Sequence, residues 1–139
     1  DPCMTDTVKL VRRYYDAFNA KDWDGMLACV ADDIRHDVNE GDRRGGKAAF
    51  REFLKGMDRN YDERLEDIVV MVDGIGSRAA AEFMVHGRYL VADPGMPEAR
   101  GQSYILPVGA FLDVRDGKIA RVTTYYNLKN WIAQVSKAA

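Results

Sequence analysis

The first part of the chain has the apolar spacing of amphipathic helices. Between residues 5 and 19 the apolar side chains recur every three or four positions, which predicts one helix. A second, shorter helix is expected to begin after Asp22 and to end near residues 31–33. A third is expected after Gly46, with an apolar face made of Phe50, Phe53, Leu54 and Met57.

Beyond about residue 62 the spacing changes to that of strands. Alternating or β-branched runs predict strands over residues 68–72, 77–91, 103–114 and 119–126. Asp116 and Gly117 form a two-residue hairpin signal between the last two strands, and a short helix with Leu128 and Trp131 closes the chain. Three helices followed by long antiparallel strands predict an α+β domain, with helices packed on one face of a curved sheet.

Composition narrows the function classes. With 139 residues and 47% hydrophobic residues, the chain suits one domain over residues 1–139. A net charge of -2 and the lack of a basic, aromatic-rich run argue against nucleic acid, and no apolar run approaches the ~18 to 20 residues of a membrane span. We expect a cytoplasmic protein with no membrane partner. Met4 is the expected natural start, with residues 1–3 a remnant of cloning.

Three quoted segments resemble a known family. They are LVRRYYDAFNAKDWDGMLACVADD, GGKAAFREFL and RDGKIARVTTYYN, and the match runs from about residue 8 to residue 127. The chain resembles the NTF2-like superfamily and, within it, the ketosteroid isomerase-related and SnoaL-like polyketide cyclase group. The resemblance implies an NTF2-like cone, in which three N-terminal helices pack on a strongly curved mixed or antiparallel sheet and enclose a pocket. It also implies a small apolar carbonyl compound as ligand, no cofactor, and a homodimer formed through the convex sheet face.

The resemblance can be carried to single residues. Ketosteroid isomerases use an Asp base, with a Tyr and a protonated Asp that stabilise the dienolate oxygen. Tyr14 falls at the position of the oxyanion-hole tyrosine, in RRYYDAF. Gly109 stands where the protonated Asp should lie, so steroid isomerisation is not predicted.

The identity of the base stays open between Asp37 and His36. The resemblance favours Asp37, whereas strand alternation places Ile34, His36 and Val38 on one face and Asp37 on the other. A bulge would bring Asp37 to the pocket. His36 has a reference pKa near 6.5 and could accept a proton at neutral pH. No metal site is expected, because His86 is predicted to face away and no metal-binding spacing is present.

The alternation of side chains along the predicted strands also indicates which residues line the pocket. Gly87 and Gly109 would be either bend glycines or positions cleared for a ligand. The expected ligand-binding residues are Trp23, Asn39, Phe53, Met57, Phe83, Val85, Phe111, Val122, Thr124 and Tyr126.

The leading functional hypothesis is cofactor-independent proton transfer beside a carbonyl, as in isomerisation, aldol-type cyclisation or dehydration. Asp37 or His36 would be the base and Tyr14 the donor to the developing oxyanion. The alternatives are a non-catalytic domain that binds a small hydrophobic molecule and a dimerisation module.

Overall fold

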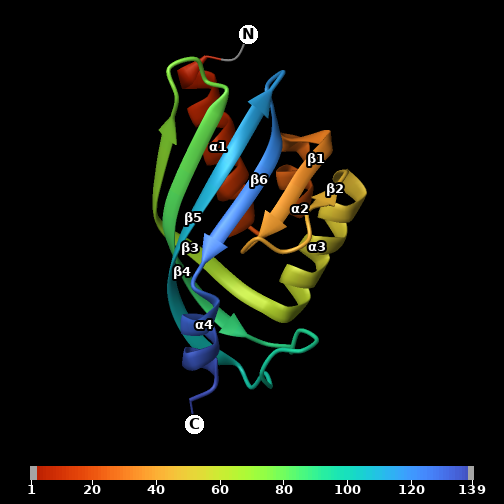
Figure 1. The fold of residues 1–139 in the computed structure, drawn as a ribbon, viewed down its shortest axis with the longest axis vertical. Coiled ribbons are helices and arrows are strands. Elements are labelled where there is room, and N and C mark those ends of the chain that lie inside the picture. Colours follow the sequence, from red (N-terminus) through yellow and green to blue (C-terminus); the bar gives the residue numbers. More distant parts are fainter. Residues whose placement is uncertain (1–2, 138–139) are drawn as a thin grey trace.

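The described part of the chain forms an open, six-stranded mixed sheet with helices on one face (Figure 1). The computed structural model describes residues 3–137. Its sheet order is β2-β1-β6-β5-β4-β3. The helices of this described part are α1 (Met4–Asn19), α2 (Trp23–Cys29), α3 (Lys47–Asn60) and α4 (Leu128–Val135). Its strands are β1 (Val30–Val38), β2 (Arg44–Gly45), β3 (Tyr61–Val72), β4 (Arg78–Tyr89), β5 (Gln102–Arg115) and β6 (Lys118–Tyr126).

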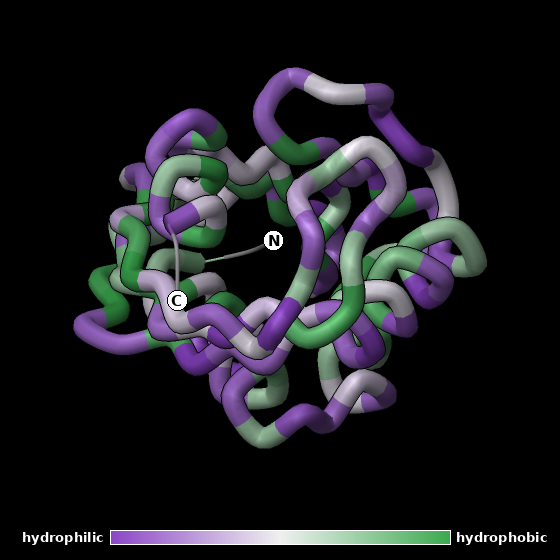
Figure 2. The backbone as a smooth tube through the Cα atoms, turned by 90° about the horizontal axis from the view of Figure 1, so that it is seen from below, coloured by the Kyte–Doolittle hydropathy of each residue, from purple (hydrophilic) through white to green (hydrophobic). Residues whose placement is uncertain are grey.

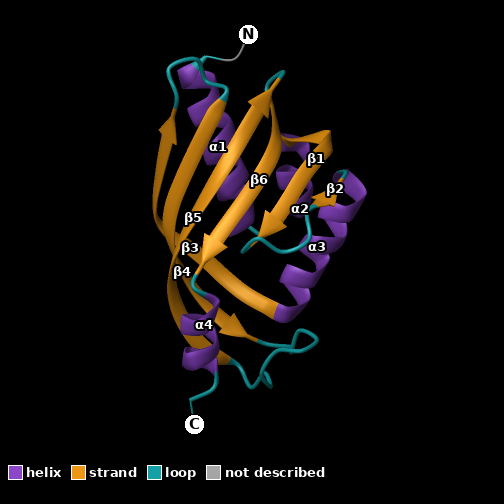
Figure 3. Cartoon of the chain, in the orientation of Figure 1, coloured by secondary structure: helices purple, strands orange, loops and turns teal. Residues whose placement is uncertain are grey.

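Helices α1 and α2 lie behind the sheet in the view of Figure 3, α3 lies at its right side next to β2, and α4 lies at the lower end, near the last described residues. The buried face of α1 includes Leu10, Val11, Tyr14 and Tyr15. The Cys3 sulfur accepts a hydrogen bond from the backbone N–H of Asp6 and so caps α1. The expectation for Asp1 and Pro2 lies outside the described residues. The predicted α+β architecture is confirmed.

Long antiparallel pairings connect β3, β4, β5 and β6, and one parallel pairing adds β1 to the sheet. In that parallel pair His36 lies beside Val122. Side chains on one face of the sheet pack against the helices; we call the opposite face the outer face. It corresponds to the convex face of the expected cone.

Two element boundaries differ from those expected. Helix α2 ends at Cys29, because Val30 and Ile34 are fully buried in a strand that begins at once. Strand β3 begins at Tyr61, directly after α3, rather than at residue 68. Its charged first half looks like a loop in the sequence, and its register shifts between Glu66 and Val69, where Asp67 has a φ of 56°.

Hydrophobic and hydrophilic stretches alternate along the backbone (Figure 2). Within residues 3–137 no helix is long and apolar enough to cross a membrane.

Candidate functional site

A cavity of about 440 Å³ lies between the helices and the inner face of the sheet. Its walls are mainly apolar, which suits a small organic ligand with a few polar groups for orientation. Nine of the residues predicted for the site line this cavity. They are Tyr14, His36, Phe53, Met57, Phe83, Val85, Val122, Thr124 and Tyr126.

His36 points into the cavity because β1 keeps its alternation there, and the register shift in the β1–β6 pairing comes before Arg35. Its ring centroid lies 5.0 Å from that of Phe50 and 4.3 Å from that of Phe53. Burial, and after it the nearby charge of Arg44, together lower the pKa of His36 to about 4. His36 is therefore neutral at pH 7. It has no hydrogen-bond partner among residues 3–137 and is only 5% exposed.

Asp37 faces the outer side of the sheet, so the hypothesis of a bulge that turns it into the pocket is wrong. Its carboxylate accepts a hydrogen bond of 2.6 Å from the Thr123 hydroxyl. It also lies 3.7 Å from the guanidinium of Arg43. With the strand still regular at this point, neighbouring side chains must point to opposite faces.

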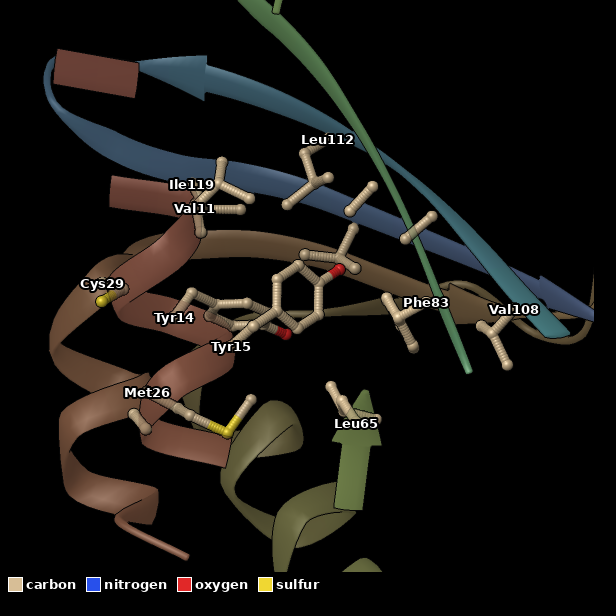
Figure 4. Packing of buried hydrophobic residues seen from close by; sticks show 14 of the residues in the cluster. Val11, Tyr14, Tyr15, Met26, Cys29, Leu65, Phe83, Val108, Leu112 and Ile119 are labelled. Carbon is tan, nitrogen blue, oxygen red and sulfur yellow. The ribbon is translucent and has the colours of Figure 1, made fainter. Parts of the chain in front are cut away.

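Tyr14 and Tyr15 project from α1 toward Leu65 and Phe83 (Figure 4). Their ring centroids are 4.9 Å apart, and the Tyr15 ring lies 5.1 Å from that of Phe83. Burial raises the pKa of both tyrosines, so both hydroxyls stay protonated and can donate a hydrogen bond. Both side chains line the cavity, and neither hydroxyl forms a hydrogen bond to another side chain or backbone group within residues 3–137.

Three predicted ligand-binding residues lie elsewhere. Trp23 packs edge-on against Phe18 and borders a separate surface cavity beside α2. Asn39 sits in a turn with a φ of 50°, where its side-chain oxygen accepts a 2.8 Å hydrogen bond from the backbone of Tyr126. Phe111 is 49% exposed on the outer face beside Tyr125, because the even-numbered residues of β5 face the core.

Glu63 is a cavity residue that the sequence pattern did not reveal. It points inward from β3, and its Oε2 accepts a hydrogen bond of 2.5 Å from the Tyr104 hydroxyl. Burial raises the pKa of Glu63, and the hydrogen bond from Tyr104 opposes that rise in part. Glu63 forms no ion pair with any residue between 3 and 137. The signal that could have found it is the alternation of Tyr61, Glu63 and Leu65, which the intervening charges obscure.

The Tyr104 ring reaches Glu63 by crossing β4 at Gly87. In the register of the sheet Gly87 lies opposite Glu63 on one side and opposite Tyr104 on the other. A Cβ atom at position 87 would lie 2.3 Å from the Tyr104 Cζ. Gly87 is therefore required by this cross-strand contact, and it is neither a bulge nor clearance for a ligand. At Gly109 a Cβ would meet nothing within 4 Å.

A second carboxylate borders the cavity from the loop after β4. Asp93 accepts a 2.6 Å hydrogen bond from the Asn60 side chain and another from the Tyr61 hydroxyl. Met96 of the same loop and Trp131 of α4 complete this end of the cavity. Burial raises the pKa of Tyr61, and its bond to Asp93 raises it further.

No set of three or more His, Cys, Asp or Glu side chains is placed to bind a metal ion in residues 3–137. His86 lies on the outer face, as predicted, where its Nε2 is 2.6 Å from a carboxylate oxygen of Glu66.

Comparisons with known proteins agree on the fold. A candidate polyketide cyclase from Xanthomonas campestris pv. campestris is 55% identical, with a TM-score of 0.92 over 96% of this chain and 98% of that one. A candidate polyketide cyclase from Silicibacter sp. TM1040 is 52% identical, with a TM-score of 0.93 over 99% and 100%. An NTF2-like protein from Burkholderia xenovorans LB400 shares the fold at 17% identity, with a TM-score of 0.78 over 98% and 100%. No curated protein matches.

The SnoaL-like domain family matches residues 11–122. This segment runs from α1 into β6 and includes His36, Glu63 and most of the cavity wall. Because this match covers most of the chain, the chain belongs to the SnoaL-like domain family.

Proposed function

We propose that the cavity binds a small, largely apolar carbonyl compound and catalyses cofactor-independent proton transfer at the carbon beside the carbonyl. Isomerisation, aldol-type cyclisation and dehydration all use this step. The observation that carries the proposal is Glu63, a carboxyl group without an ion-pair partner in the described chain, held in a mainly apolar cavity with its pKa raised by burial. Perturbed carboxyl groups in a cavity are typical of acid–base catalysts.

Glu63 is the proposed base. A general base works best when its pKa lies near the working pH, and burial moves the pKa of Glu63 in that direction. Asp37 is unsuitable because it faces away from the cavity. His36 is a weak base because its pKa of about 4 makes it release a proton readily at neutral pH.

The proposed donor to the carbonyl oxygen is the hydroxyl of Tyr14. Negative charge develops on that oxygen as the proton leaves the neighbouring carbon, and preorganised donors in a dry site stabilise it. Tyr14 lines the cavity, and its hydroxyl forms no hydrogen bond to another residue between 3 and 137. Tyr126 lines the same space, and Glu63 raises the pKa of its hydroxyl, after the larger effect of burial.

The similarity to candidate polyketide cyclases favours the cyclisation variant. An aldol cyclisation begins when a base removes a proton beside one carbonyl, and the resulting enolate then attacks a second carbonyl in the same molecule. A cavity of about 440 Å³ has the size expected for a compact ligand of this kind.

The test is hydrogen–deuterium exchange at the carbon beside a ketone. Aryl and alkyl ketones are incubated with the protein in deuterated buffer, and proton loss is followed by NMR. The wild type is expected to accelerate exchange, and Glu63→Gln to reduce that acceleration by about 10²- to 10⁴-fold with ketone affinity nearly unchanged.

Glu66→Gln is the matched control. Glu66 lies on the same strand but on the outer face, where it pairs with Arg64 and His86. Exchange in this variant should stay within about twofold of the wild type. If ketones bind and wild-type exchange does not exceed that of the buffer, the catalytic proposal fails and the cavity is a binding site only.

We also propose that the protein forms a homodimer through the outer face of the sheet. Exposed apolar side chains gather there, and exposed patches of this kind mark interaction surfaces. Met71, Ala80 and Phe111 lie in register across β3, β4 and β5. The most exposed apolar side chains of this face are Val69, Met71, Ile105, Phe111 and Tyr125.

A further inference from the structure

Arg44 brings a positive charge to the edge of the cavity. It lies on the two-residue strand β2, directly opposite His36 in the pairing with β1. Its side chain lines the cavity, and the guanidinium carbon is 5.9 Å from the centre of the Phe53 ring. Arg44 is also exposed to solvent, so it stands where a ligand would enter.

The neighbouring basic residues are neutralised, whereas Arg44 is not. Arg35 pairs with Asp113, Arg43 with Asp37, and Lys47 with Asp32. Arg44 forms no ion pair with any carboxylate in residues 3–137. The first turn of α3, which follows β2 directly, carries no acidic residue. The cavity edge at β2 therefore has a positive charge without a protein counter-ion in the described chain.

His36 adds a second polar group at the same place. It is almost fully buried, faces the cavity, and has neither a donor nor an acceptor partner within residues 3–137. Because the ring faces the cavity, a ligand there can supply the hydrogen bond that no residue of this segment makes. As a neutral imidazole, His36 offers one N–H donor.

We propose that Arg44 and His36 form a subsite for a carboxylate, so that the natural ligand is a small apolar keto acid. The proposal rests on the function proposed above, because it assigns one end of the same ligand. The guanidinium supplies charge and directed N–H donors to the carboxylate oxygens, and the imidazole N–H supplies a further donor. The apolar body of the ligand then lies along Phe53, Met57 and Val122.

Charged groups at the opposite end of the cavity determine the orientation of the bound keto acid. Glu63 lies on β3, the sheet edge opposite β2, and Asp93 accepts a hydrogen bond from Tyr61 at the start of the same strand. Two carboxyl groups there repel a ligand carboxylate and so favour its placement at Arg44. The ketone of a bound keto acid consequently points toward Glu63, where proton transfer is proposed.

The test uses 4-oxo-4-phenylbutanoate and its primary amide, which have the same carbon skeleton and differ in whether the terminal group is an anionic carboxylate or a neutral amide. Titration calorimetry gives both affinities for the wild type, Arg44→Gln, Arg44→Lys and Arg43→Gln. The wild type should bind the acid at least about tenfold more tightly than the amide. Arg44→Gln should abolish that preference and Arg44→Lys should keep part of it, because the charge remains.

Arg43→Gln is the matched control, because Arg43 precedes Arg44 but pairs with Asp37 on the outer face. It should keep the wild-type preference. NMR titration of the His36 ring gives an independent readout, since a bound carboxylate should raise the pKa of His36 whereas the amide should not.

The two proposals fail in different ways. Equal affinity for acid and amide, an unchanged preference in Arg44→Gln, or no binding of either compound would overturn the carboxylate subsite. Tight, Arg44-dependent binding without exchange beside the ketone would support the subsite and contradict the proton-transfer function.

Discussion

His36 is an imidazole held in its neutral form by its surroundings. Phe50 and Phe53 pack against its ring, and the guanidinium of Arg44 is close enough to disfavour a second positive charge. The pKa of His36 is therefore lowered to about 4, below the value of about 6.5 expected in the unfolded chain. This difference couples the charge of one side chain to the stability of the fold.

We expect His36 to make the protein less stable in mild acid. Between about pH 6.5 and pH 4 the unfolded chain binds a proton at His36 that the folded protein does not, so stability falls as the pH falls through this window. The effect is on the order of 3 kcal/mol at its largest. Chemical denaturation near pH 7 and about pH 4.5 measures it.

His36→Gln removes the titrating group. Between pH 7 and about pH 4.5 the variant should therefore lose about 2–3 kcal/mol less stability than the wild type. His86→Gln is the control, because His86 lies on the outer face beside Glu66. Equal losses in the wild type and His36→Gln would contradict the assignment.

Where a strand is regular, the alternation of its side chains predicts correctly which residues face the cavity. His36 faces inward because Ile34, His36 and Val38 keep one parity, and the same rule excludes Asp37. The prediction that Phe111 faces the pocket is wrong, because its strand carries apolar residues on both faces and alternation then gives no signal. The sequence does not predict Glu63 as a cavity residue, because a carboxylate among charged neighbours is usually solvated.

At the scale of elements, β3 and β5 are joined by a side chain that crosses β4. The Tyr104 ring passes over Gly87 and hydrogen-bonds Glu63. This contact fixes the position of the proposed base. It also explains a glycine in the middle of a strand, where glycine is otherwise unfavourable.

Gly87→Ala should therefore destabilise the fold by about 1–3 kcal/mol, because the new methyl group would overlap the Tyr104 ring. Gly109→Ala is a close control: it is also in a strand interior, and its Cβ would meet nothing within 4 Å. Its effect should stay within about 0.5 kcal/mol. Thermal or chemical unfolding measures the stability of both variants. Equal losses of stability would contradict the role given to Tyr104.

Element type was easier to predict from the sequence than element boundaries. The four helices and the β4–β5–β6 hairpins follow from apolar spacing and from the Asp116-Gly117 turn. The start of β3 depends on tertiary pairing of Tyr61 with Tyr89, which no local pattern records. The same holds for the parallel contact between β1 and β6.

On the scale of the whole molecule, the two faces of the sheet differ in what covers them. The inner face, with the helices, encloses the cavity, while the outer face leaves Met71, Ile105 and Phe111 exposed. The proposed homodimer would cover these side chains and leave the cavity interior untouched.

Phe111→Glu should shift the protein from dimer to monomer, because it places a charge at the centre of the proposed apolar interface. Sedimentation velocity over a concentration series measures the change. Ile75→Glu is the control: Ile75 is 69% exposed in the turn before β4, beyond the sheet face. A monomeric wild type, or equal behaviour of both variants, would contradict the dimer.

The contact of Tyr104 with Gly87 has an evolutionary consequence. A larger residue at position 87 excludes an aromatic ring at position 104, and without that ring the acid at position 63 loses its hydroxyl donor. The three positions should therefore drift together in descendants of a common ancestor. Relatives in which all three positions have changed are expected to have a pocket with different chemistry.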